Sequence, residues 1–324
     1  MNPSGGIAIT GLGHPLADGL AHRLLGSDRP VPVVALGSRL PVGLRGKLEL
    51  HAVDPADPGA ESEIGDFLER RSIETVAHMP FEPSPGEGFD GDVGWLARAA
   101  ANVGSASVRA GVKRLIVASS TMCYGARPEN PNFLGEDRDL VGHAESPWLL
   151  DQCAAEEAVA RLALRYPQID VCTLRYPWVM GPEFEDSVAR YFAGMAVPVP
   201  MGRDPLLQFI HERDLLDRFE RAVRGEARGI FNVVADGALP VSRLLALAGK
   251  KGLAMPDRLL RSVPGAPRLG PGSESAAVFF DYLRYLWVAD GERARAEFGT
   301  PLYTTQEAWV AFVSARRAPR GDRA

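Results

Sequence analysis

The sequence predicts an α/β fold, a Rossmann-type doubly wound parallel sheet with a smaller C-terminal substrate lobe. Short apolar stretches alternate with longer helical stretches up to residue 176, and this alternation implies parallel strands joined by crossover helices. Beyond residue 180, segments rich in proline and glycine at 197–206 and 264–273 separate shorter helices. We therefore expect a Rossmann-type domain at 1–180, a smaller lobe at 181–316 interwoven with it, and a frayed tail at 317–324.

Each predicted element follows from its own pattern. Short apolar runs bounded by turn residues predict strands at 6–10, 31–36, 47–53, 73–79, 112–120 and 169–176. Helical periodicity predicts helices at 16–25, 95–111 and 147–166. The second of these helices ends at a glycine, which is a typical helix end, and the third helix has the strongest pattern in the chain.

Composition excludes several classes of protein. A net charge of -5 without a basic run argues against nucleic acid as a partner. Three cysteines without a CxxC pair fit a reduced, cytoplasmic protein. No apolar run reaches the ~20 residues that cross a bilayer, and the start MNPSGGIAIT lacks the pattern of a signal peptide. The histidines and cysteines show no metal-ligand spacing, so we expect no membrane span and no metal.

A glycine turn follows the first strand, in the segment ITGLGHPLADGL. Glycines between a strand and a helix let the backbone approach a pyrophosphate, which then lies at the helix N-terminus. Gly11 and Gly13 occupy the first two small positions, whereas the third falls at Leu16 or Ala17. The predicted cofactor contacts here are Gly11, Leu12, Gly13, His14, Pro15 and Leu16. The alternative is a tight turn without a ligand.

The end of the second strand carries Ser38 and Arg39 in place of the usual ribose-binding carboxylate. A guanidinium suits a 2′-phosphate, because it can bind phosphate through two parallel hydrogen bonds. The predicted cofactor is therefore NADP or NAD, with NADP favoured. In the alternative interpretation, Arg39 is a solvated loop cation.

Further segments carry a family resemblance. The turn is followed in order by AVDPAD, VAHMP, AGVKRLIVASSTMCYG, LRYPWVMGP and QFIHERDLLDRF. Together they resemble the extended short-chain dehydrogenase/reductases, specifically the NAD-dependent epimerase/dehydratase family, from about residue 6 to about residue 313. The resemblance implies that Ser120 is the catalytic hydroxyl. It further implies cofactor contacts at Asp54, Pro55, His78, Met79, Pro80, Ser119, Gln152, Tyr176 and Pro177.

Two positions depart from that family's pattern, in the segment ESPWLLDQCAAEEA. Trp148 stands where the resemblance places the catalytic tyrosine, and Gln152 stands where it places the lysine. An indole N–H can only donate a hydrogen bond, and an uncharged amide cannot lower the pKa of a neighbouring group. The standard hydride transfer is disabled in this interpretation, since Ser120 alone only orients an oxygen.

Other residues are weaker candidates for proton transfer. His143 lies in the loop before the altered helix, and a histidine titrates near neutral pH. Tyr124 corresponds to a packing residue in the family, and nothing near Cys123 in sequence would lower the pKa of its thiol. The charged segment 129–139 is interpreted as a polar surface loop.

Two functional hypotheses therefore remain from the sequence. The first is a dinucleotide-binding protein without standard catalysis, in a sensing or scaffold role. The second is a diverged oxidoreductase or epimerase that acts on a nucleotide sugar or secondary metabolite through a non-standard acid/base. A third, weaker interpretation is that the nucleotide site has decayed as well. An unknown small-molecule ligand and a homodimer through helices 95–111 and 147–166 are expected partners.

Overall fold

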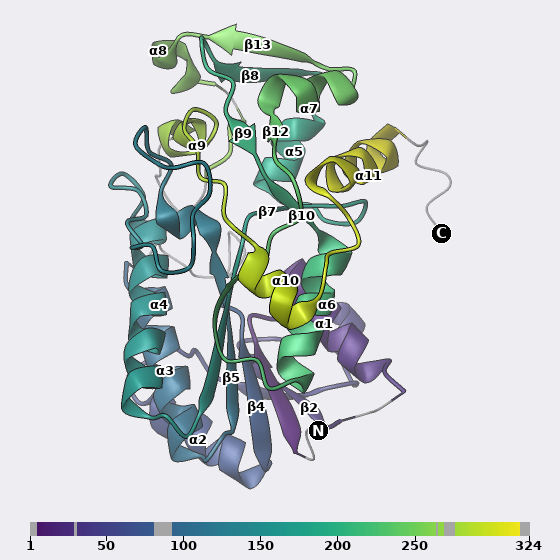
Figure 1. Cartoon of the computed structure of the whole chain (residues 1–324). Coiled ribbons are helices and arrows are strands. Elements are labelled where there is room, and N and C mark those ends of the chain that lie inside the picture. The colour runs from purple at the N-terminus through teal and green to yellow at the C-terminus, as the bar shows by residue number, and fades with distance from the viewer. Residues whose placement is uncertain (1–4, 29–30, 81–92, 264, 269–275, 318–324) are drawn as a thin grey trace. The chain divides into compact units, whose positions relative to one another are not determined.

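The structure is a computed structural model that describes residues 5–28, 31–80, 93–263, 265–268 and 276–317 (Figure 1). Most of the predicted frayed tail, from residue 318 on, lies outside the described residues. The chain forms two compact units. The first comprises Met1–Ser119, Asp151–Arg175 and Leu216–Phe231, and the second comprises Ser120–Leu150, Tyr176–Leu215 and Asn232–Ala324. Each unit therefore contains residues from both sides of position 180.

The first unit is built on a seven-stranded sheet with the order β11-β6-β5-β4-β1-β2-β3. Its strands are β1 (Gly6–Thr10), β2 (Val33–Gly37), β3 (Glu49–Ala52), β4 (Ile73–His78), β5 (Arg114–Ser120), β6 (Asp170–Tyr176) and β11 (Gly229–Asn232). The pairs from β3 through β2, β1 and β4 to β5 are parallel. Every residue of β1 is buried, as expected for a central strand covered on both faces. The predicted Rossmann-type sheet is confirmed.

Helices cover both faces of this sheet. They are α1 (Pro15–Leu25), α2 (Ala60–Arg70), α3 (Trp95–Arg109), α4 (Pro147–Arg165) and α6 (Glu212–Arg224), and a short 3-10 helix, η1 (Val42–Leu44), follows β2. In Figure 1, α2, α3 and α4 lie on one side of the strands, whereas α1 and α6 lie on the other. The order of the strands reverses beside β1. In parallel α/β sheets, ligands bind outside the carboxyl ends of the strands, at the point where the strand order reverses.

Among its described residues, the second unit contains three two-stranded sheets and most of the shorter helices. Its strands are β7 (Trp178–Met180), β8 (Ala196–Pro200), β9 (Leu206–Leu207), β10 (Phe209–His211), β12 (Leu239–Pro240) and β13 (Lys251–Met255), paired as β10-β7, β12-β9 and β13-β8. Its helices are η2 (Thr121–Tyr124), α5 (Ser187–Ala193), α7 (Val241–Leu247), α8 (Asp257–Leu260), α9 (Ala276–Tyr282), α10 (Glu292–Phe298) and α11 (Thr305–Arg317).

Aromatic side chains form the core of this second unit. The Trp178 ring lies edge-on to Trp287, with centroids 5.0 Å apart, and tilted against Phe279 at 5.5 Å. Trp309 stacks on Phe209 at 5.7 Å, and its indole N–H donates to the Leu244 carbonyl at 2.7 Å. Each aromatic ring buries a large apolar area. A few such rings can therefore form the core of a unit whose strands are short.

Candidate functional site

The β1–α1 turn lies in the first unit. It has the tight strand-to-helix geometry that its glycines predict. Gly11 and Gly13 both have positive φ, at 77° and 107°, a region that glycine adopts without a steric penalty. A Cβ on Gly11 would lie 1.8 Å from the Met79 carbonyl oxygen, so only glycine fits there. Near Gly13, by contrast, no described atom outside residues 12–14 lies within 4 Å of the position a Cβ would take.

Helix α1 begins with a cap formed by its own side chains. His14 is the N-cap residue, and its Nδ1 accepts a hydrogen bond from the Leu16 N–H at 3.3 Å. Burial lowers the pKa of His14 to about 3, so the ring is neutral near pH 7. The Asp18 carboxylate accepts a hydrogen bond from the Gly13 N–H at 2.8 Å. Sequence reasoning did not identify Asp18, because an acidic residue in a first helical turn is common.

At the end of β4, His78 is 1% exposed and lies next to the turn. Thr10 Oγ1 accepts a hydrogen bond from the Met79 N–H at 3.0 Å, and it lies 3.0 Å from His78 Nδ1. Which of these two groups donates depends on the tautomer of the ring, and the second ring nitrogen is Nε2. That Nε2 is buried without a hydrogen-bond partner among the described residues. Burial lowers the pKa of His78 to about 4.

The ends of β2 and β3 surround a hollow of about 390 Å³. It is lined by Ser38, Ala52, Val53, Asp54, Asp57, Pro58, Ala60 and Glu63. The Asp54 carboxylate accepts hydrogen bonds from the Ala56 N–H at 2.9 Å and from the Trp95 indole at 3.1 Å. Ser38 and Arg39 are exposed at the end of β2. This hollow thus carries carboxylates beside the predicted phosphate-binding arginine.

Within the first unit, α4 is anchored by buried polar contacts. Glu156 is 3% exposed, and its carboxylate accepts hydrogen bonds from Ser119 Oγ at 2.5 Å and from Arg175 Nε at 2.8 Å. The Asp151 carboxylate accepts a hydrogen bond of 2.9 Å from the Leu96 N–H, which lies at the start of α3. A buried carboxylate with such partners fixes how a helix is rotated about its axis. Sequence reasoning identified neither Glu156 nor Asp151, since their partners are distant in sequence.

Gln152 and Ser119 are both buried in the first unit, at 5% and 3% exposed. Ser119 is engaged by Glu156, so its hydroxyl proton is already used. Trp148, on the same helix but in the second unit, is half-buried against that unit's core. Its indole N–H is buried and has no hydrogen-bond partner among the described residues.

Ser120 and Tyr176 lie together in the second unit. Ser120 Oγ donates to the Tyr176 carbonyl at 3.2 Å and accepts from the Met122 N–H at 3.1 Å. Burial raises the pKa of the Tyr176 phenol far above its usual value, and the charges of Asp186 and Cys123 add to the rise. Tyr176 therefore stays protonated at any ordinary pH and cannot act as a base.

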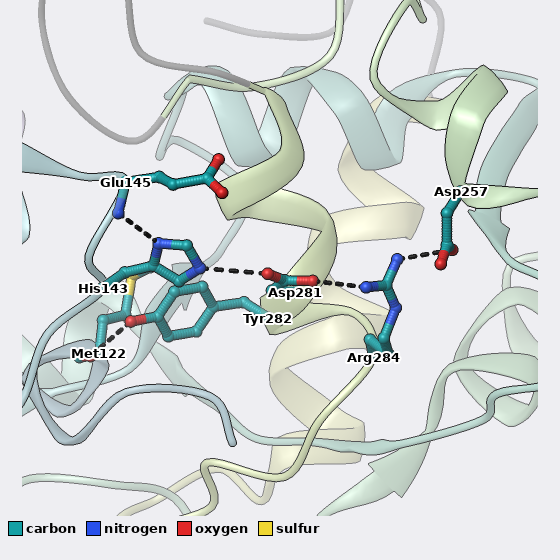
Figure 2. A network of polar contacts seen from close by, with 7 residues as sticks. All are labelled: Met122, His143, Glu145, Asp257, Asp281, Tyr282 and Arg284. Carbon is teal, nitrogen blue, oxygen red and sulfur yellow. Dashed lines mark hydrogen bonds and ion pairs between the residues drawn. The ribbon is translucent and has the colours of Figure 1, made fainter. Parts of the chain in front are cut away.

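His143 is held by contacts at both ring nitrogens (Figure 2). Nδ1 accepts a hydrogen bond from the Glu145 N–H at 3.1 Å, so the ring proton is assigned to Nε2, which lies 3.1 Å from Asp281 Oδ2. Figure 2 shows Asp281 between His143 and Arg284, which donates to the other Asp281 oxygen at 2.8 Å. With the lone pair of Nδ1 engaged, the ring has no unoccupied acceptor in this geometry.

The remaining sequence candidates lie in the same unit. The Tyr124 hydroxyl donates to Asn232 Oδ1 at 2.8 Å, a buried contact, and Cys123 is buried as well. The charged segment 129–139 borders a hollow of about 690 Å³, which the sequence did not predict. Across the part of the chain that the structure describes, no group of histidine, cysteine and acidic side chains could hold a metal ion. Nor is any described helix long and apolar enough to cross a membrane.

The sequence model of the NAD dependent epimerase/dehydratase family matches residues 7–233. The chain belongs to this family. Uncharacterized proteins of Mycobacterium tuberculosis and Mycobacterium bovis are 33% identical over 206 residues, which cover 63% of this chain and 55% of each relative. The chain thus spans about half the length of these relatives. A 3-diazoavenalumate denitrifying reductase of a Streptomyces species is 28% identical over 228 residues, 64% of this chain and 72% of that protein.

Solved structures share the fold at low sequence identity. The Bordetella bronchiseptica enzyme WbmH, in complex with NAD+, is 17% identical with a TM-score of 0.69, over 97% of this chain and 98% of that one. A UDP-glucose 4-epimerase of Thermotoga maritima, with UDP-glucose, is also 17% identical with a TM-score of 0.69, over 96% and 98%. At such identities the likeness establishes the fold, whereas function depends on the residues at the site.

Proposed function

We propose that this chain binds a nicotinamide dinucleotide without carrying out the family's standard hydride transfer. Its output would then be a ligand-dependent conformation or contact, in a sensing or scaffold role. Family membership and the β1–α1 turn support dinucleotide binding. The residues on one face of α4 support the loss of standard chemistry.

That face of α4 is the observation that carries the proposal. Trp148, Gln152 and Glu156 follow one another at helical spacing, so they share one side of the helix. Glu156 is buried and bound to Arg175 and Ser119, which fixes the rotation of the helix. The family resemblance assigns the acid/base and its lysine to positions 148 and 152. Neither an indole nor an amide can transfer a proton near neutral pH, so a bound cofactor would lack its proton relay.

The form of the cofactor depends on two opposing features of the first unit. Arg39 at the end of β2 favours a 2′-phosphate, because guanidinium pairs with phosphate in a bidentate geometry. Asp54, Asp57 and Glu63 line the neighbouring hollow and oppose a further negative charge. We propose weak binding of both dinucleotides, with NADPH ahead of NADH because only the phosphorylated cofactor can use Arg39.

The test is a calorimetric titration of the purified protein with NADPH and NADH, alongside turnover assays with nucleotide sugars and simple carbonyl compounds. We expect weak binding, a preference for NADPH and no hydride transfer above background. The variant Arg39→Gln should lose the preference and keep NADH binding. Equal affinity of the unmodified protein for both cofactors would show that Arg39 does not favour NADPH. No binding of either would contradict the proposed function.

A second candidate function is a diverged oxidoreductase or epimerase. It is favoured by the relative from Streptomyces, which is named a reductase. A turnover rate on the order of 1 s⁻¹ or faster would establish this candidate and overturn the first. His143 would then be the first residue to mutate. To accept a proton at Nδ1, His143 would first have to break its hydrogen bond with the Glu145 N–H.

A further inference from the structure

Three backbone N–H groups of the β1–α1 turn are hydrogen-bonded within the turn and the first turn of α1. The Gly13 N–H donates to Asp18 Oδ1 at 2.8 Å. The His14 N–H donates to the Gly11 carbonyl at 3.3 Å, and the Leu16 N–H donates to His14 Nδ1, also at 3.3 Å. The residue between His14 and Leu16 is a proline, which has no N–H. Positions 13 to 16 therefore offer a diphosphate no unoccupied backbone donor in this geometry.

Asp18 also places a negative charge where an anionic ligand would lie. The N-terminus of a helix attracts anions through its exposed N–H groups and its dipole. Asp18 is half-buried in the first turn of α1 and already bound to one of these groups. His14 cannot compensate this charge, since the low pKa of His14 leaves it neutral. A diphosphate must therefore displace the carboxylate or tolerate its repulsion.

Two observations indicate that the turn still has room for a ligand and an unpaired polar atom beside it. No described atom outside residues 12–14 lies within 4 Å of the position a Cβ on Gly13 would take, so that side of the glycine is open among the described residues. His78, which is hydrogen-bonded to the last residue of β1, keeps a buried Nε2 atom without a described partner. A buried polar atom of this kind costs free energy unless it is hydrogen-bonded.

We propose that Asp18 is a specificity-determining residue, an internal competitor that holds the Gly13 N–H and opposes the diphosphate of a nucleotide ligand. The inference rests on the proposed dinucleotide function. It attributes the weak binding of dinucleotides to the Asp18 side chain. Ligands whose diphosphate displaces Asp18 bind, and a ligand with more negative charge at this turn is penalised further. Adenosine lacks the diphosphate, so its affinity does not depend on Asp18.

The experiment compares the unmodified protein with Asp18→Asn, Asp18→Ala and Glu61→Gln, using ADP, NADH and adenosine in calorimetric titrations. Asp18→Asn removes the charge and keeps a side chain of the same shape, so the turn should stay folded. Asp18→Ala also releases the Gly13 N–H. Glu61→Gln is the control, because it makes the same change of charge at an exposed position in the first turn of α2.

Both Asp18 variants should bind ADP and NADH about tenfold tighter or more than the unmodified protein, since hydrogen bonds to charged groups are among the strongest in proteins. Glu61→Gln should match the unmodified protein, and adenosine should not respond to Asp18. If all variants bind NADH with equal affinity, the inference is overturned and the proposed function stands. If the Asp18 variants gain ADP binding while no form binds NADH, the inference stands and the proposed function fails. If no form binds ADP or NADH, both fail.

Discussion

Trp148 makes apolar contacts rather than hydrogen bonds with the described residues around it. It packs against the core of the second unit, and its indole N–H is buried there without a described partner. An unsatisfied buried donor costs on the order of 1–3 kcal/mol, so this N–H lowers the stability of the fold as it stands. Gln152, one helical turn further, is buried in the first unit. Changing these two residues therefore tests whether α4 retains the geometry of an active family member.

The double variant Trp148→Tyr plus Gln152→Lys should restore a phenol and, one turn away, an ammonium group that lowers its pKa. We expect tighter dinucleotide binding, because the new lysine can hydrogen-bond a ribose hydroxyl, and trace reductase activity on a permissive carbonyl compound. Gln152→Met is the matched control, since it has a similar length and no charge. Titration and NADPH-oxidation assays provide the measurements. A double variant that binds no better than Gln152→Met would contradict this geometry.

At the residue scale, sequence predicts the glycines better than their neighbours. Gly11 and Gly13 were identified because a tight strand–helix turn requires positive φ, and the structure gives both that conformation. The contact between Asp18 and the Gly13 N–H was not predicted, although the two residues are close in sequence. A first-turn acid usually faces solvent, and only the path of the turn brings this one back to the backbone.

At the scale of elements, the predicted strands and helices in the first half of the chain agree with the structure to within two residues at most ends. Helix α2 was not predicted, although Ala60, Ile64 and Leu68 are buried at helical spacing. Its many charged residues obscure that narrow apolar stripe. The contact of Glu156 with Arg175 was also beyond sequence reasoning, because it joins a helix to a strand that only the fold brings together.

Helix α4 carries exposed leucines that support the predicted homodimer. Leu164 is 86% exposed and Leu150 is 44% exposed, and their spacing places them on one side of the helix. Exposed apolar side chains of this kind are typical of surfaces that bind another protein. We expect Leu164→Glu to shift a dimer toward monomer, measured by light scattering at micromolar concentration. Leu302→Glu, at an equally exposed leucine outside α3 and α4, is the control. A monomeric unmodified protein would contradict the dimer.

At the scale of the whole molecule, sequence order and structure diverge most. The sequence suggested a boundary near residue 180, with the smaller lobe interwoven with the first domain, and each compact unit collects segments from several parts of the chain. Helices α4 and α6 each pass from the second unit into the first. Chain crossings of this kind leave no local signal in composition or periodicity, so the cores of the two units could be recognised only from their contacts.

Global stability should depend on pH through the buried His78. The unfolded chain binds a proton at this histidine near its ordinary pKa of about 6.5, but burial lowers the pKa of the folded form to about 4. Unfolding therefore takes up a proton between these values, and the contribution is present above about pH 6.5 and lost as the pH falls toward about 4. The expected loss is on the order of 3 kcal/mol.

The variant His78→Asn isolates this contribution, since an asparagine amide can either donate to the Thr10 hydroxyl or accept from it. Urea titrations between about pH 7 and about pH 4 give the free energy of unfolding for each form. His14 has a similarly low pKa, of about 3, and adds a parallel decline that both forms share. His14→Asn, which retains a good N-cap, removes that second decline as a comparison. We expect a flatter pH dependence for His78→Asn than for the unmodified protein, even if it is less stable at neutral pH. Parallel curves would mean that His78 is protonated as easily in the folded protein as in the unfolded chain, and that its ring is not desolvated.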